Sequence, residues 1–134
     1  MEKIQLCWLR RDLRLNDHAA LYHALKSGLK VQLLFIFDTN ILKKLPIYDT
    51  RLDFIHQALS QLNDELKAYN ASLLVIHDTP IKAFEKCIAQ FNIDTVFTNH
   101  DYEPYAQQRD TEIKDFLQQH QIAFETYKDQ VIFE

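Results

Sequence analysis

Glycine is nearly absent from this chain of 134 residues, which contains one glycine, three prolines and two cysteines. A phosphate-binding Walker loop and the Gly-x-Gly-x-x-Gly turn of dinucleotide-binding domains each need more than one glycine, because the backbone must approach the phosphates closely. The single Gly28 therefore excludes both motifs, and with them the commonest nucleotide chemistry of α/β domains.

Cysteines are few and long apolar runs are missing. Cys7 and Cys87 both fall in apolar segments, a pattern that indicates two buried thiols in a reducing cytoplasm and not a disulfide. No run of about 18 apolar residues occurs, so the sequence predicts no membrane partner. The first residues also lack the basic start and apolar centre of a signal peptide. We therefore expect a cytoplasmic protein.

The charge of the chain and its histidines exclude further classes of function. A formal net charge of −4 argues against a main phosphate-binding surface, because nucleic-acid affinity depends on Lys and Arg. The six histidines show no metal-ligand spacing. Asp101 and Glu103 stand beside His100, but no nucleophile accompanies these possible acid–base groups. We expect neither a catalytic residue nor a metal site in this chain.

Apolar segments of strand length alternate with segments of helical periodicity. The expected strands are 4–9, 31–37, 73–77, 95–98 and 123–128. The expected helices are 18–27, 50–69, one that begins at Pro80 and one that Pro104 opens. This order predicts an α/β fold: a doubly wound, Rossmann-like, parallel sheet of five strands in the order 3-2-1-4-5, with helices on both faces.

Helix ends and one helix face can also be predicted. Asp17 is the expected N-cap of the first helix and Gly28 its C′ residue. Thr79 is the expected N-cap of the third helix, since Pro80 suits its first position. The buried stripe expected on that helix consists of Ile81, Phe84, Ile88 and Phe91.

A ligand is expected beyond the carboxyl ends of the strands, where the strand order reverses between the first and fourth strands. The loops 10–16 and 99–103 meet at that point. Loop 10–16 and the residue after it contain many charged residues: Arg10, Arg11, Asp12, Arg14 and Asp17. Ion pairs among these residues and with Asp38 or Asp101 would fix the loops, because the planar guanidinium of arginine suits such contacts. Binding of an anion or polar ligand is the alternative.

Four short motifs follow one another along the chain. They are WLRRDLRLND (8–17), FIFD (35–38), RLDFI (51–55) and NHDYEPY (99–105), the last followed by Arg109 and Asp110. Together they resemble, in the same order, the N-terminal domain of the DNA photolyase and cryptochrome family. The resemblance covers essentially the whole chain.

The resemblance implies that residues 1–134 form the N-terminal α/β antenna domain and that the helical, FAD-binding catalytic domain is absent from this chain. The full-length protein would be a deoxyribodipyrimidine photolyase, a carbon–carbon lyase that repairs pyrimidine dimers by blue-light-driven electron transfer from FAD. This fragment alone would be inactive. Its partners would be its own C-terminal helical domain and, through that domain, damaged DNA. The surface that meets the helical domain could pair copies of an isolated chain.

The resemblance also implies a light-harvesting chromophore in this domain. Folate-type members carry an Asn-Glu pair where this sequence has Tyr105 and Ala106, so a deazaflavin or flavin is the expected antenna. The residues implied as its contacts are Phe35, Ile36, Phe37, Asp38, Arg51, Asp101, Glu103 and Arg109. Two alternatives stay open: a cryptochrome photoreceptor without repair, and a nucleotide-binding module like the stress proteins.

Overall fold

The computed structural model of the chain describes residues 2–10, 13–15, 18–39, 50–68, 72–100 and 104–128. In chain order the elements are β1 (Lys3–Leu9), α1 (Ala19–Lys26), β2 (Lys30–Asp38), α3 (Thr50–Lys67), β3 (Leu73–Asp78), α4 (Pro80–Gln90), β4 (Asn92–Asn99), α5 (Pro104–Gln119) and β5 (Ala123–Tyr127). Each predicted strand and helix is present, with ends that shift by a few residues.

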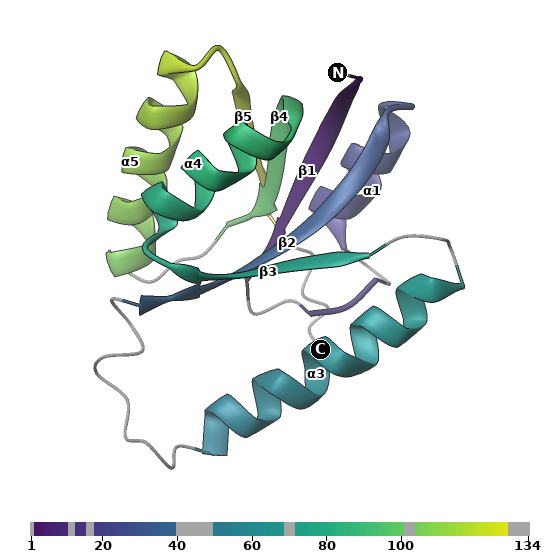
Figure 1. Cartoon of the computed structure of the whole chain (residues 1–134). Coiled ribbons are helices and arrows are strands. Elements are labelled where there is room, and N and C mark those ends of the chain that lie inside the picture. Colours follow the sequence, from purple (N-terminus) through teal and green to yellow (C-terminus); the bar gives the residue numbers. More distant parts are fainter. Residues whose placement is uncertain are drawn as a thin grey trace.

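The strands form one sheet in the order β3-β2-β1-β4-β5, and every neighbouring pair is parallel (Figure 1). This confirms the predicted doubly wound α/β fold and its strand order. The central strands are buried on both faces: six of the seven residues of β1 are buried. Near-continuous apolar strands are typical of a parallel sheet that helices cover on both sides.

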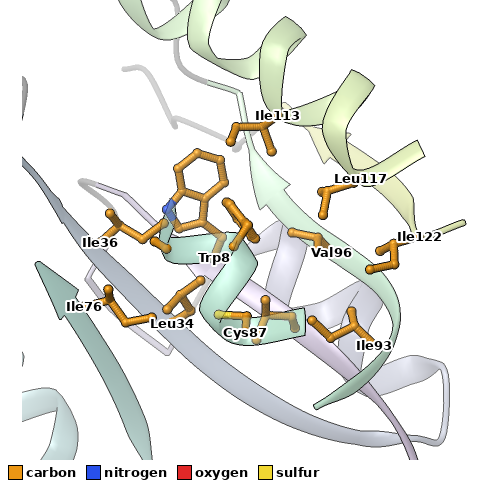
Figure 2. Close-up of a cluster of buried hydrophobic side chains, with 13 residues drawn as sticks. Trp8, Leu34, Ile36, Ile76, Cys87, Ile93, Val96, Ile113, Leu117 and Ile122 are labelled. Atoms are coloured by element: carbon orange, nitrogen blue, oxygen red, sulfur yellow. The ribbon is translucent and has the colours of Figure 1, made fainter. Parts of the chain in front are cut away.

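The two faces of the sheet carry separate cores. On one face, Leu6 and Trp8 of β1 pack with Phe84 and Cys87 of α4 and with Ile113 of α5. Figure 2 shows this cluster, in which Trp8 lies at one end beside Ile113 and Ile36. We call this the α4–α5 face.

The opposite face is covered by α1 and α3, and we call it the α1–α3 face (Figure 1). Cys7 and Leu9 of β1 lie here with Leu21 of α1 and Leu62 of α3. Successive strand residues point to opposite faces, so β1 supplies both cores in alternation.

The two cysteines lie in different cores, and neither forms a disulfide. Cys7 and Cys87 are each 0% exposed. Burial raises the pKa of the Cys87 thiol to about 12, so this thiol stays protonated. The two buried thiols are those that the sequence predicted. No helix in the described parts of the chain has the length and apolar character needed to cross a membrane.

The predicted helix caps are partly right. Gly28 follows α1 with φ of 85°, the left-handed conformation expected of a C′ glycine. Thr79 caps α4, and its hydroxyl accepts a hydrogen bond from the N–H of Lys82. The prediction of Asp17 as the cap of α1 is wrong. His18 holds that position, and its Nδ1 accepts from the N–H of Leu21 at 3.1 Å.

The buried face of α4 is shifted relative to the predicted stripe. Its buried residues are Pro80, Ala83, Phe84 and Cys87. The other predicted members, Ile81, Ile88 and Phe91, are partly buried and pack against the edge of the core. Ala83, Phe84 and Cys87 are each 0% exposed, so of the predicted stripe only Phe84 lies at the centre of the buried face.

Candidate functional site

The carboxyl ends of β1, β2 and β4 meet the first turns of α5 on the α4–α5 face of the sheet. Strand alternation places Asp38 on the same face as Ile36, and Thr98 on the same face as Val96. The polar side chains of this region contact one another through ion pairs and hydrogen bonds. We call the set the ionic edge; its members are Arg10, Asp38, Thr98, Tyr105, Arg109 and Asp110.

Asp38 joins β2 to α5. It ends the strand, is 5% exposed, and one of its oxygens, Oδ2, faces two side chains of the helix. The Tyr105 hydroxyl donates to Oδ2 at 2.7 Å, and Arg109 Nη1 lies 3.5 Å from the same atom. A buried carboxylate needs such partners, because water no longer solvates its charge.

Arg10 joins β1 to α5 and to β4. Its Nη2 lies 2.8 Å from Asp110 Oδ1, and both side chains are largely buried. Its Nε donates to the Thr98 hydroxyl at 3.0 Å, and that hydroxyl donates to the carbonyl of Trp8 at 2.8 Å. The first arginine of the charged opening stretch therefore ties the end of β1 to its neighbours.

Trp8 lies beneath both arginines. The guanidinium carbon of Arg10 is 4.3 Å from the ring centroid, and that of Arg109 is 5.0 Å away. The indole is 2% exposed and meets Phe84 edge to face at 5.2 Å. A buried indole attracts cations through its ring face. The two like charges can share one ring because Asp38 and Asp110 balance them.

The α1–α3 face is different at the same edge of the sheet. Phe35 and Phe37 lie here, 4.9 Å apart and edge to face. Phe37 also stacks on His77 at 4.5 Å and on His56 at 5.0 Å. These four described residues contact one another through their rings and not through ion pairs.

The start of α1 is fixed to the end of β4 on this second face. Asn99 is 3% exposed and its Oδ1 accepts from the N–H of Ala20 at 3.0 Å. The cap His18, also 3% exposed, lies beside the Asn99 amide. This pair sits at the point where the strand order reverses, and it anchors the helix.

The structure brings together only some of the residues predicted to hold an antenna. Asp38 and Arg109 are in contact, and Ile36 lies on their face of the sheet. Phe35 and Phe37 lie on the opposite face. Arg51 belongs to the first turn of α3, but its side chain is outside the described set.

Several predicted residues fall outside the described parts of the chain. They are Arg11, Asp12, Asp17, Asp101 and Glu103. Arg14 lies in the short described stretch 13–15 and is half-buried. Within the described parts of the chain, no group of three or more His, Cys, Asp or Glu side chains could hold a metal ion.

The sequence predicted no role for four residues at or beneath the ionic edge: Trp8, Thr98, Tyr105 as a partner of Asp38, and Asp110. One of them could have been found. Trp8 and Arg10 are two residues apart at the end of a strand, a spacing that puts both side chains on one face. The contacts of Thr98 and Asp110 depend on strand register and helix placement, which the spacing does not give.

Two pKa shifts occur near this edge of the sheet. The N–H of Thr79 and the ammonium of Lys86 both lower the pKa of Asp78 below its usual 3.8. Burial raises the pKa of Tyr127, and the nearby charge of Glu125 raises it further. Both groups keep their ordinary charge state at neutral pH, so neither is a candidate acid or base.

Comparison with known proteins gives one family. The family model described as DNA photolyase matches residues 5–134. A deoxyribodipyrimidine photo-lyase of Alkalihalophilus pseudofirmus is 31% identical over 138 residues; the match covers 99% of this chain and 28% of that protein. This chain thus spans less than a third of the length of that relative.

Solved structures of the family share the fold. A cryptochrome of Synechocystis sp. PCC6803 has a TM-score of 0.86 at 24% identity, over 94% of this chain and 27% of that one. An archaeal photolyase of Sulfolobus tokodaii has a TM-score of 0.79 at 26% identity, over 97% of this chain and 31% of that one. The latter is described with two FAD molecules, implying a novel light-harvesting cofactor.

Proposed function

This chain belongs to the DNA photolyase family, and on that premise we propose that it is the light-harvesting and scaffold domain of a deoxyribodipyrimidine photolyase. The full-length enzyme repairs UV-induced pyrimidine dimers by blue-light-driven electron transfer from FAD. The 134 residues alone are catalytically inactive, and the FAD-binding helical domain lies outside them. The match to a photolyase over 99% of this chain and 28% of that protein carries this proposal.

The antenna of this domain is a deazaflavin or a flavin. Its support is the ionic edge, where Asp38 and Arg109 meet beside the ring of Tyr105. A flat ring with polar edges needs apolar walls and a few fixed donors and acceptors. The described residues provide both, so they fit such a chromophore. The photolyase described with two FAD molecules is a precedent for a flavin in this role.

The partner of this domain is its own C-terminal helical domain, which in turn binds damaged DNA. A net charge of −4 favours DNA binding by the helical domain and not by this one, since an acidic domain binds phosphates poorly. The isolated chain would self-associate through the surface that the helical domain covers. The two buried thiols, neither of them in a disulfide, fit a reducing cytoplasm.

A cryptochrome photoreceptor is the second candidate function. The TM-score is 0.86 to a cryptochrome and 0.85 to a bacterial photolyase, and the two classes share this domain. The stress-protein-like nucleotide module is set aside, because the photolyase family model covers residues 5–134.

Light-dependent repair by the complete reading frame tests the proposal. The purified protein should contain FAD and should remove cyclobutane dimers from UV-treated DNA under blue light, with no loss of dimers in the dark. Repair establishes the photolyase. Bound FAD without repair of any pyrimidine dimer contradicts the photolyase and favours the cryptochrome, and absence of FAD contradicts both.

A further inference from the structure

The N-cap of α1 is a histidine. His18 is 3% exposed, and its Nδ1 accepts a hydrogen bond from the N–H of Leu21 at 3.1 Å. The common cap residues Ser, Thr, Asp and Asn accept such a bond at neutral and at mildly acidic pH. A histidine differs from them, because its ring nitrogen accepts only while it carries no proton. The cap of α1 therefore depends on the protonation state of one buried side chain.

The side chain of Asn99 presents donors to the same ring. Asn99 Oδ1 accepts from the N–H of Ala20 at 3.0 Å, and this bond fixes the orientation of the amide. The amide nitrogen Nδ2 then lies 3.4 Å from Nδ1 and 3.5 Å from Nε2 of His18. The N–H groups of Leu21 and Asn99 thus both face the imidazole. This arrangement suits a neutral ring with its proton on Nε2, whereas a proton on Nδ1 would point at a donor.

A charged imidazole would also oppose the helix that it caps. The N-terminus of α1 is the positive end of the helix dipole, which disfavours a cation at that position. The first turn, residues 19–22, contains no acidic residue to offset the charge. Burial adds to the cost, because a charge loses its hydration in the interior. Protonation of His18 should therefore break the cap and not charge the capped state.

Other groups that can carry a charge surround the start of α1. The described ones are His23 of α1, Cys7 of β1, Glu125 and Tyr127 of β5, His100 after β4, and Arg14. On this face β2 contributes apolar residues, and Asp94 of β4 stands at the other end of that strand from Asn99. Asp17 lies outside the described residues. His23 and His100 titrate in the same pH range as His18, so a test must separate three histidines.

We propose that His18 makes the attachment of α1 to the sheet sensitive to pH: protonation of its Nδ1 breaks the cap and releases the start of α1 from Asn99. The cap is formed at neutral pH and is lost as the pH falls, because the open state takes up a proton that the capped state excludes. The start of α1 lies where the strand order reverses, so acid opens this end of the α1–α3 face before the rest of the sheet. The proposal does not depend on an antenna or on repair.

Hydrogen exchange of single amides, followed by NMR on the whole chain, tests the proposal. The Leu21 N–H exchanges only when the cap opens, so its rate, corrected for intrinsic exchange, gives an opening constant. Below the ordinary histidine pKa of about 6.5, this constant should rise about tenfold per pH unit, the slope for uptake of one proton on opening. The Ala83 N–H bonds to the carbonyl of Thr79, the cap of α4, and is the internal reference. Its opening constant should change by less than about twofold per pH unit.

Three asparagine substitutions separate the histidines. In His18→Asn the new side chain can cap α1 without titrating in this range, so the Leu21 opening constant should change by less than about twofold per pH unit. His23→Asn and His100→Asn each remove a neighbouring histidine and keep the cap. Both should retain the slope of about tenfold per pH unit at Leu21. Circular dichroism and thermal unfolding at neutral pH should show that the three variants are folded.

The parent chain alone can overturn the proposal, whether or not His18→Asn folds. If the slope at Leu21 is no steeper than that at Ala83, either the cap does not respond to acid or the whole domain opens together, and the proposal is wrong. A steep slope that persists in His18→Asn assigns the effect to another group and overturns it as well. Nitrogen chemical shifts of the His18 ring give a second readout. The ring proton should be on Nε2 at neutral pH, and a neutral ring protonated on Nδ1 would contradict the proposal.

Discussion

The two faces of the sheet end differently at the edge where the site lies. On the α4–α5 face, Arg10 and Arg109 pair with Asp110 and Asp38 around the ring of Trp8. On the α1–α3 face, the ring contacts of Phe37 hold the strand ends instead. The same strands build both faces, because alternate residues of β2 point to opposite sides.

The two faces therefore contribute different properties to the domain. Apolar packing stabilises any arrangement that excludes water, whereas a buried charge is stable only with its partner at the right distance. The α1–α3 face therefore contributes mainly stability. The ionic edge contributes fixed positions for side chains, which is what a chromophore with polar edges requires.

The largest expected effect is the loss of packing on the α1–α3 face. Phe37→Ala should lower the free energy of unfolding by about 3–5 kcal/mol, because Phe37 is 4% exposed and its removal leaves a cavity. Urea denaturation at low and high salt should give the same loss. Tyr22→Ala is the control, since Tyr22 is 60% exposed. A loss under about 1 kcal/mol would contradict close packing of this face.

The second prediction concerns the opposite face. Asp38→Ala should cost about 3 kcal/mol, because it leaves the buried guanidinium of Arg109 without its nearest carboxylate. Adding Arg109→Met should restore part of the loss, since an apolar side chain needs no partner. A double-mutant cycle in urea measures the coupling. Strictly additive losses would mean that the two side chains do not act as a pair.

The fold could be predicted from the sequence because its signals are periodic and local. Near-continuous apolar strands, a proline after Thr79 and a glycine after α1 each specify an element without help from distant residues. The cap of α1 was predicted one residue too early. Aspartate is the commoner cap, but the burial of His18 beside Asn99 decides the position, and that contact joins residues 81 apart in the chain.

The site could be predicted only in part, because its contacts are between elements. The carboxyl ends of strands were expected to gather the charged residues, and Arg10, Asp38 and Arg109 do lie there. The partner of Arg10 was not foreseen, since Asp110 stands one hundred positions later and faces it only when α5 packs beside β1. Phe35 and Phe37 are close to Asp38 in sequence, but their side chains point to the other face because strand residues alternate.

The third prediction distinguishes a partly exposed ion pair from the buried ones of the ionic edge. Asp78 begins the connection to α4, and Lys86 Nζ lies 3.1 Å from its Oδ2. Its lowered pKa means that the folded state gains stability above the usual pKa of 3.8 and loses it as the pH falls toward the lowered value. Asp78→Asn should therefore reduce the fall in stability on acidification.

This effect should be small and sensitive to salt, because water and ions screen exposed pairs. Chemical denaturation of parent and variant at neutral pH and below pH 3.8, at two salt concentrations, measures it. A fall in stability on acidification that is equal in both proteins would show that Asp78 contributes nothing. Asp64→Asn is a matched control, since Asp64 also faces a lysine but is 70% exposed.

The last prediction concerns the two cysteines, which report on each face separately. Cys7 lies in the α1–α3 core and Cys87 in the α4–α5 core. A reagent reaches a buried thiol only after local opening, so Cys7→Ala and Cys87→Ala each leave one thiol whose labelling reports on the opening of one face. Asp38→Ala should then speed the labelling of Cys87 more than that of Cys7, because the ionic edge closes only one face. Equal acceleration at both thiols would mean that the sheet opens as one unit and that the difference between its faces has no consequence for local stability.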